Sequence, residues 1–406
     1  MANHSAGFDT RAVHVGAECD PGTGAVVSPI YLASTYKQDG VGKNKGYAYT
    51  RVDNPNRNQL EKLLASLELG GGSAIAFPAG SSATANAVQA LGQNPHIICI
   101  DDVYGGTYTY LTRIANEVQG LETTFVDLER SSDEEIIACF RENTKMVWLE
   151  LPTNPSLRVI DISRIVRLTR AHPSNPLVLI DNTFLSPFYL SPFLLGVDII
   201  LHSLTKYVNG HSDVLMGALV FPAEPNHPHA TAYARRARFL QVFSGAVPSP
   251  HDCWLAHRGA KTMHLRMQAH GRNALKIATY LQSIAGPNSA VESVTYPGLA
   301  THPRYEVALR QLSPTAKEYI DNLSPNETSE GIPYGGMITF RIKGGIDAGM
   351  PEAQRLSLGI TPNLIRLSIG IEDPKDLIAD IRQALQAAVP SFVPDEPEPA
   401  NTTQAI

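Results

Sequence analysis

The chain has 406 residues, 18% of them charged and 43% hydrophobic, and its 33 basic against 39 acidic residues give a formal net charge of −6. This composition excludes wholesale disorder, and the mild negative charge argues against nucleic acid as the main partner. No apolar run reaches the ~18 residues of a membrane span, the N-terminus lacks the apolar centre of a signal peptide, and the four cysteines form no CxxC pair. We therefore expect a cytoplasmic protein with no membrane partner and no structural metal.

Short apolar, β-rich runs recur along the first half of the chain, and stretches with helical character separate most of them. The main runs are His96–Ile100, Thr123–Val126, Lys145–Leu149, Leu177–Ile180, Ile199–Leu201 and Leu215–Phe221. Uninterrupted apolar strands that alternate with helices predict an α/β fold whose mostly parallel sheet is covered on both faces. Ligands gather at the carboxyl ends of such strands, so the polar residues after each run are the first candidates for a site.

Two of these strand ends carry an acid and a lysine. Asp181 follows the fourth run and Lys206 follows the fifth, and their spacing of 25 residues fits one strand–helix–strand unit. This pair suits pyridoxal 5'-phosphate (PLP), because a lysine amine forms a Schiff base with its aldehyde and a carboxylate keeps its ring nitrogen protonated. Ser203 and Thr205 offer hydroxyls for the phosphate. A surface lysine and an ion-paired aspartate remain an equal alternative on spacing alone.

Two further segments are weaker candidates. Gly80 and Ser81 lie in a small-residue turn after a short apolar run, where the start of a helix would favour an anion, although many α/β turns look the same. Tyr104 follows the run that ends at Ile100, and it could stack on a flat ring or simply pack. Residues 209–213 with His202 are a poor metal site, because no second histidine falls at helical ligand spacing.

Seven longer motifs resemble those of the PLP-dependent trans-sulfuration enzymes. They occupy residues 47–57, 101–107, 148–155, 181–184, 203–213, 245–252 and 363–373. The resemblance implies a PLP-dependent transferase of fold type I, which is aspartate-aminotransferase-like. It further implies three parts: an arm (1–60) that contacts a neighbouring subunit, a PLP-binding large domain (61–265) and a smaller C-terminal α/β domain (266–388). The remaining tail (389–406) contains a run of proline and acidic residues, and this composition predicts disorder.

The resemblance also assigns roles. Lys206 would hold PLP and move protons, Asp181 would pair with the ring nitrogen, and Tyr104 would stack on the ring and help to deprotonate the incoming amine. The other implied cofactor-binding residues are Tyr49, Arg51, Gly80, Ser81, Thr183, Ser203 and Thr205. Tyr49 and Arg51 would reach the phosphate of the PLP bound in a neighbouring subunit, which implies at least a homodimer. A tetramer is the usual assembly in the family. Asn154 and Arg366, with Tyr49, would hold the substrate carboxylate.

The implied reaction is α,γ-elimination of cystathionine to cysteine, 2-oxobutanoate and ammonia. The cystathionine γ-synthase and methionine γ-lyase reactions are alternatives, because those enzymes share the same residues. Thr109 stands where close relatives carry an arginine, and this puts recognition of the far end of cystathionine in doubt. A polar stretch at residues 315–331 is expected to be a surface loop.

The largest departure from the family is a gap. Gly345 is followed almost at once by Met350, so a few dozen residues are absent, including a glutamate–serine pair beside the substrate, and the small domain is expected to be truncated. We favour a splice or gene-model product that lacks one segment of a normal enzyme, because the motifs on both sides are intact. The alternative is an impaired variant that acts at most as a non-catalytic subunit.

Overall fold

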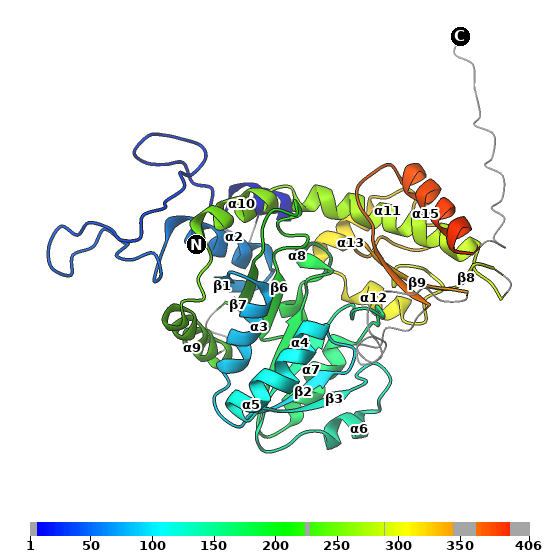
Figure 1. Cartoon of the computed structure of the whole chain (residues 1–406), viewed down its shortest axis with the longest axis horizontal. Helices are drawn as coiled ribbons and strands as arrows, with labels where there is room; N and C mark the ends of the chain where they lie inside the picture. Colours follow the sequence, from blue (N-terminus) through cyan, green and yellow to red (C-terminus); the bar gives the residue numbers. More distant parts are fainter. Residues whose placement is uncertain (1–5, 224–227, 288, 344–362, 390–406) are drawn as a thin grey trace, which may run out of the picture.

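The computed structural model describes residues 6–223, 228–287, 289–343 and 363–389, and it contains two sheets of unequal size (Figure 1). The larger sheet has the strand order β1-β7-β6-β5-β4-β2-β3 and the smaller one β10-β9-β8. The strands are β1 Gly71–Phe77, β2 His96–Ile100, β3 Glu122–Val126, β4 Thr144–Glu150, β5 Leu177–Asp181, β6 Ile199–Ser203, β7 Gly217–Pro222, β8 Val291–Thr295, β9 Met337–Ile342 and β10 Leu364–Ser368.

The large sheet is mostly parallel, as predicted. Strands β3, β2, β4, β5 and β6 run parallel to one another, whereas β7 is antiparallel to both β1 and β6. Strands β2 and β7 are buried along their whole length, because helices cover both faces. All six predicted apolar runs are strands.

Helices connect and cover these strands. Those of the large sheet are α2 Pro55–Leu67, α3 Gly80–Gln89, α4 Gly105–Thr109, η1 Tyr110–Ala115, α5 Asn116–Gln119, α6 Asp133–Ala138, α7 Ile162–Ala171, α8 Ser186–Tyr189, η2 Pro192–Leu195, α9 Pro228–Ser244 and α10 Pro250–Ala260. Several begin at side chains that accept the first free backbone N–H groups, as Asn54 does for α2 and Ser132 does in the capping box of α6.

The smaller sheet packs against the long helix α11 (Met263–Ser283) and is joined by α12 (Tyr305–Gln311), α13 (Pro314–Asp321) and α15 (Pro374–Ala388). Helix α11 continues across the predicted domain boundary at residue 265. The position of that boundary therefore remains a prediction. The first half of the expected loop at 315–331 is helix α13, and Ser313 caps its start, so the loop prediction was wrong there.

Several sequence predictions fall on residues outside the described ranges. The gap between Gly345 and Met350 is one of them, and the tail beyond Val389 is another. The strands that flank the gap, β9 and β10, are hydrogen-bonded neighbours, with Arg341 opposite Leu364. No helix in the described part of the chain is long and apolar enough to cross a membrane.

The N-terminal arm lies apart from both sheets. After the short helix α1 (Phe8–His14), the chain loops away from the body, as the dark blue segment of Figure 1 shows. Its apolar side chains are solvent-exposed, with Val26 at 75% and Leu32 at 73%. Exposed apolar side chains on an extended segment are typical of a surface that another chain covers.

Candidate active site

A cavity of about 300 Å³ lies at the carboxyl ends of β4, β5 and β6. Of the twelve residues predicted for the site, ten line it: Gly80, Ser81, Tyr104, Asn154, Asp181, Thr183, Ser203, Thr205, Lys206 and Arg366. The fold therefore brings together residues that are far apart in the sequence, at the sheet edge where α/β proteins bind ligands.

Lys206 and Asp181 occupy neighbouring strand ends, as their spacing predicted. Strands β5 and β6 are parallel neighbours with Asp181 opposite Leu201, and Lys206 lies in the turn that follows β6. The Lys206 carbonyl accepts a hydrogen bond from the Gly210 N–H at 2.8 Å. These backbone contacts fix where the lysine side chain starts.

Thr183 ties the two strand ends together. Its backbone N–H donates to Asp181 Oδ1 at 3.0 Å, and its hydroxyl oxygen accepts the Ser203 N–H at 2.8 Å. The Asp181 carboxylate is therefore oriented by Thr183, and Ser203 is held next to it.

The start of α3 provides an anion site beside Ser203 and Thr205. Helix α3 begins at Gly80, and no side chain caps its free N–H groups. A Cβ on Gly80 would lie 3.4 Å from Ser203 Cβ, so the glycine lets the helix start approach that strand end closely. Free N–H groups and the helix dipole favour a phosphate at this position.

Two carboxyl groups lie side by side in the cavity wall: Glu150 is buried and Asp181 is partly buried. Glu150 is the last residue of β4 and is opposite Asp181 on β5. Burial raises the pKa of both carboxyls, well above the usual range for Glu150, where the nearby Asp181 charge is the second cause. For Asp181, the hydrogen bonds from Thr183 oppose the rise in pKa. A cationic group beside Asp181 would stabilise its ionised form.

Glu150 is the site residue that the sequence reasoning missed. The available signal was its position as the first polar residue after the apolar run 145–149. The same rule had selected Asp181, and applying it to every strand end would have found Glu150 too.

Tyr104 lies at the rim of the cavity and is half-exposed. Its backbone N–H donates to Glu150 Oε2 at 2.9 Å. Its ring passes so close to Gly106 that a Cβ there would lie 2.5 Å from Tyr104 Cε1. The stacking role of this ring stays a prediction, whereas the hydrogen bond to Glu150 holds the Tyr104 backbone.

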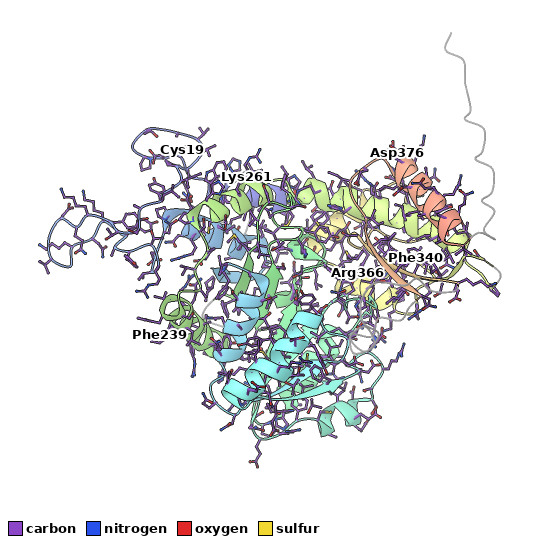
Figure 2. The ribbon with its side chains drawn as sticks, in the orientation of Figure 1. Cys19, Phe239, Lys261, Phe340, Arg366 and Asp376 are labelled. Carbon is purple, nitrogen blue, oxygen red and sulfur yellow. The ribbon has the colours of Figure 1, made fainter. Side chains whose placement is uncertain are left out.

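Arg366 brings the small domain into the site. It lies on β10 and donates a hydrogen bond to Asn154 Oδ1, and its guanidinium carbon is 5.9 Å from the centre of the Phe184 ring. Figure 2 shows Arg366 on the side of the small domain that meets the large domain. A planar guanidinium beside an amide suits the binding of a carboxylate.

Tyr49 and Arg51 do not line the cavity of their own chain. Arg51 Nη1 donates to the Val242 carbonyl of α9 at 2.9 Å, and its guanidinium carbon lies 5.5 Å from the centre of the Tyr49 ring. Their predicted contact with a neighbouring subunit stays a prediction. Thr109 is exposed on α4 and does not line this cavity.

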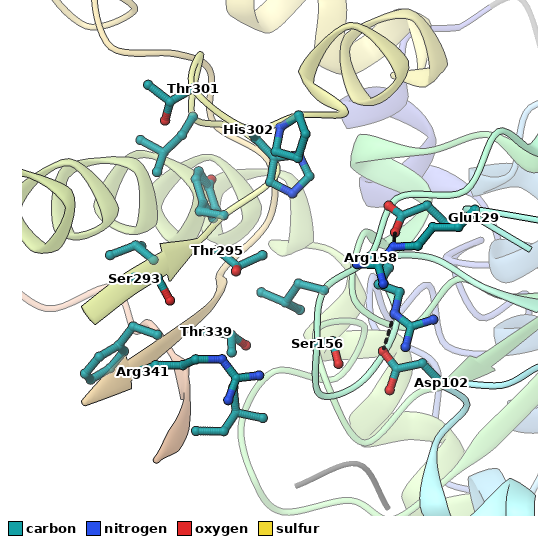
Figure 3. A pocket seen from close by; sticks show the side chains of 18 of the residues that line it. Asp102, Glu129, Ser156, Arg158, Ser293, Thr295, Thr301, His302, Thr339 and Arg341 are labelled. Atoms are coloured by element: carbon teal, nitrogen blue, oxygen red, sulfur yellow. Dashed lines mark ion pairs between the residues drawn. The ribbon is translucent and has the colours of Figure 1, made fainter. Parts of the chain in front are cut away.

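A larger cavity, about 730 Å³, lies between the two domains and contains none of the predicted site residues (Figure 3). Asp102 and Arg158 lie on one side, and Ser293, Thr339 and Arg341 on the other. Arg158 is paired with Asp101 at 2.9 Å. Size alone therefore does not locate the site.

Residues 9–319 and 335–386 match the family described as Cys/Met metabolism PLP-dependent enzyme. The chain belongs to this family. The cystathionine gamma-lyase of Saccharomyces cerevisiae is 40% identical over 417 aligned positions, covering 94% of this chain and 98% of that protein. The cystathionine gamma-lyase of Homo sapiens is 41% identical and covers 95% of both chains. The cystathionine beta-lyase of Lactococcus lactis subsp. cremoris is 40% identical, covering 93% and 98%.

Solved structures agree on the fold. The crystal structure of metB from Corynebacterium glutamicum superposes with a TM-score of 0.82 at 35% identity, covering 95% of this chain and 99% of that one. Yeast cystathionine gamma-lyase gives a TM-score of 0.81 at 38% identity, covering 95% and 98%. The predicted fold class is confirmed, and the chain is a PLP-dependent lyase of the Cys/Met family.

PLP is therefore the expected cofactor, and the residues present fit it. The cavity offers a lysine, a partly buried carboxylate for the ring nitrogen and a free helix start for the phosphate. The alignment with the yeast relative has more positions than this chain has residues, so part of it must consist of gaps in this chain.

Proposed function

We propose that the chain carries out the PLP-dependent α,γ-elimination of L-cystathionine to L-cysteine, 2-oxobutanoate and ammonia. The observation that carries this proposal is the convergence of Lys206, Asp181 and the Arg366–Asn154 pair on one cavity. The names of the yeast and human relatives support the choice of substrate.

Each part of PLP has a matching group in the cavity. Lys206 would hold the aldehyde carbon and Asp181 the ring nitrogen, while the α3 start with Ser203 and Thr205 would hold the phosphate. Bound PLP supplies an electron sink that stabilises negative charge on the substrate carbons. The Asp181 carboxylate keeps this sink effective, because it favours a protonated ring nitrogen.

The protein's own groups would bind the substrate and move its protons. Arg366 and Asn154 would fix the α-carboxylate, and this contact orients the Cα–H bond. Lys206 Nζ would accept that proton and return it later in the cycle. The Tyr104 hydroxyl, at the rim, would take a proton from the incoming amine.

The proposal includes a shared-site homodimer, with a tetramer as the expected assembly, in the cytoplasm. Tyr49 and Arg51 lie on the arm, outside the cavity of their own chain. The exposed apolar side chains of that arm support its burial against a second copy.

Product analysis separates the candidate reactions. Cleavage at the γ-carbon of cystathionine releases 2-oxobutanoate and cysteine, whereas β-cleavage, suggested by the Lactococcus relative, releases pyruvate and homocysteine. Methionine, and an activated homoserine with cysteine, test the methionine γ-lyase and γ-synthase alternatives. The γ-lyase proposal fails if cystathionine is the poorest of the substrates or gives pyruvate.

A non-catalytic subunit is the rival function, because of the gap after Gly345. The first test is to express the chain with PLP, isolate the oligomer on a sizing column and record its visible spectrum before and after Lys206→Ala. We expect a visible band that the substitution abolishes. No band, or only aggregate, would mean that the activity belongs to a longer product that contains the missing segment.

A further inference from the structure

Glu150 contacts two separate parts of the cavity wall with one carboxyl group. It is 5% exposed and lies at the end of β4, opposite Asp181. Its Oε2 accepts the Tyr104 N–H at 2.9 Å, and the nearby Asn154 N–H lowers the pKa of the same carboxyl. Tyr104 opens the segment that leads into α4, and Asn154 follows β4. A single buried side chain thus joins the segment that carries the predicted ring-stacking residue to the one that carries the predicted carboxylate-binding residue.

We propose that Glu150 is a positioning residue, which holds Tyr104 over the cofactor ring and Asn154 beside Arg366. This inference rests on the proposed function, because it gives the two positioned residues their roles. Glu150 would act through the backbone of these residues and would make no bond to the reacting atoms.

The need for an acceptor at this place follows from burial. A backbone N–H without a partner costs free energy away from water, so the Tyr104 N–H requires an acceptor in the wall. An apolar side chain at position 150 would remove that acceptor, and Tyr104 would have to move to find another.

The neighbouring charge explains why this acceptor suits the site. Asp181 and Asp102 face the Glu150 carboxyl, and with burial they raise its pKa well above the usual range. The raised pKa favours the uncharged form of the Glu150 carboxyl over the charged form beside Asp181.

Asp198 provides a matched control at the opposite edge of the same sheet. It is 5% exposed, accepts the Val178 N–H at 2.7 Å and pairs with Arg170 at 2.6 Å. It therefore resembles Glu150 in burial and in accepting a backbone N–H, but it lies before β6, away from the cavity. If the Glu150 carboxyl served only the stability of the fold, its removal should affect the melting temperature, the PLP affinity and the dichroism in the same way as removal of the Asp198 carboxyl.

The experiment compares Glu150→Leu, Glu150→Gln and Asp198→Ala in the full chain. Three quantities are measured for each: the affinity of the apo-protein for PLP by absorption titration, the circular dichroism of the bound PLP band, and the melting temperature. The dichroism reports the asymmetry of the ring's surroundings, which a change in stability alone does not alter.

We expect Glu150→Leu to weaken PLP binding about tenfold and to reduce the dichroism, since one buried acceptor is lost. Glu150→Gln keeps a carbonyl oxygen and should bind PLP within about threefold of wild type. Asp198→Ala also removes a buried acceptor, and it should lower the melting temperature and leave PLP affinity and dichroism unchanged. If Glu150→Leu does not fold, Glu150→Ala takes its place under the same criteria.

Two results would overturn this inference and leave the proposed function standing: wild-type PLP affinity and dichroism in the Glu150→Leu protein, or the same losses of affinity and dichroism in Asp198→Ala. Wild-type protein that takes up no PLP would overturn the proposed function, and this inference with it.

Discussion

The two carboxyls at the ends of β4 and β5 make the stability of the cofactor-free chain depend on pH. Burial raises the pKa of both Glu150 and Asp181 above the unfolded values. The folded state then binds more protons than the unfolded state once pH exceeds the unfolded pKa of ~4.3 for glutamate. The contribution of Glu150 to the free energy of unfolding is complete below that pH, and it is lost as the pH rises through the pKa of Glu150 in the folded chain.

Glu150→Gln should remove the Glu150 part of this dependence. The free energy of unfolding of the variant minus that of wild type is expected to grow with pH above ~4.3, by at most about 1.4 kcal/mol per pH unit. Urea unfolding of both apo-proteins between pH 5 and pH 8 measures it. A difference that stays constant, or shrinks, would show that Glu150 ionises in the folded chain as easily as in the unfolded one.

Individual site residues could be predicted from the sequence where they lie directly after a strand whose end is predictable. Asp181 and Lys206 followed from that rule, because the apolar runs before them fix the strand ends. Glu150 obeys the same rule but was absorbed into a longer motif. Arg51 could not be placed this way, because it lies in an arm without periodic structure, and the structure puts it against Val242 of its own chain.

The contact between β7 and α3 decides whether the phosphate site stays in place. A Cβ on Gly217 would lie 2.6 Å from the Ala79 carbonyl oxygen and 2.7 Å from Gly80 Cα, both backbone atoms. Gly217→Ala must therefore push the start of α3 away from the sheet. We expect a loss of about 1–3 kcal/mol in stability and a PLP affinity about tenfold weaker.

Gly286→Ala is the control for this substitution, because no atom lies within 4 Å of its added Cβ. Equilibrium unfolding and PLP titration of both variants give the comparison. If Gly217→Ala binds PLP as wild type does, the α3 start is not part of the phosphate site.

The elements themselves were largely predictable, but their order was not. Apolar runs identify strands because both faces of the sheet are covered. The same runs carry no information on direction, so the antiparallel insertion of β7 between β1 and β6 could not be foreseen. Helix α13 was mistaken for loop, because its flanking Ser, Pro and Asn residues outweighed its short helical pattern.

The complete site requires more than the large domain. Arg366 reaches Asn154 from β10, while most of the cofactor-facing residues come from the large sheet and its loops. The position of β10 relative to the large domain therefore controls the carboxylate contact. The predicted gap falls on the connection between β9 and β10, so any effect of the gap should appear in substrate binding through Arg366 before it appears in PLP binding.

The arm leads to a prediction about the assembled molecule, which does not depend on turnover. If Arg51 serves the neighbouring subunit, each site in an Arg51→Ala dimer lacks the arginine that its partner should supply. This protein should therefore lose most of its visible PLP band.

Lys206→Ala chains cannot form the band themselves, but they can supply an intact Arg51 to a partner. The two variants are unfolded and refolded together in equal amounts. About half of the Arg51→Ala chains then pair with a Lys206→Ala chain in a two-fold dimer. The band per Lys206-containing site should therefore recover to about half of the wild-type value. An absorption spectrum of the mixed oligomer, against each variant refolded alone, measures the recovery. If the band does not recover, Arg51 acts within its own chain, beside the Val242 carbonyl to which it is bonded here.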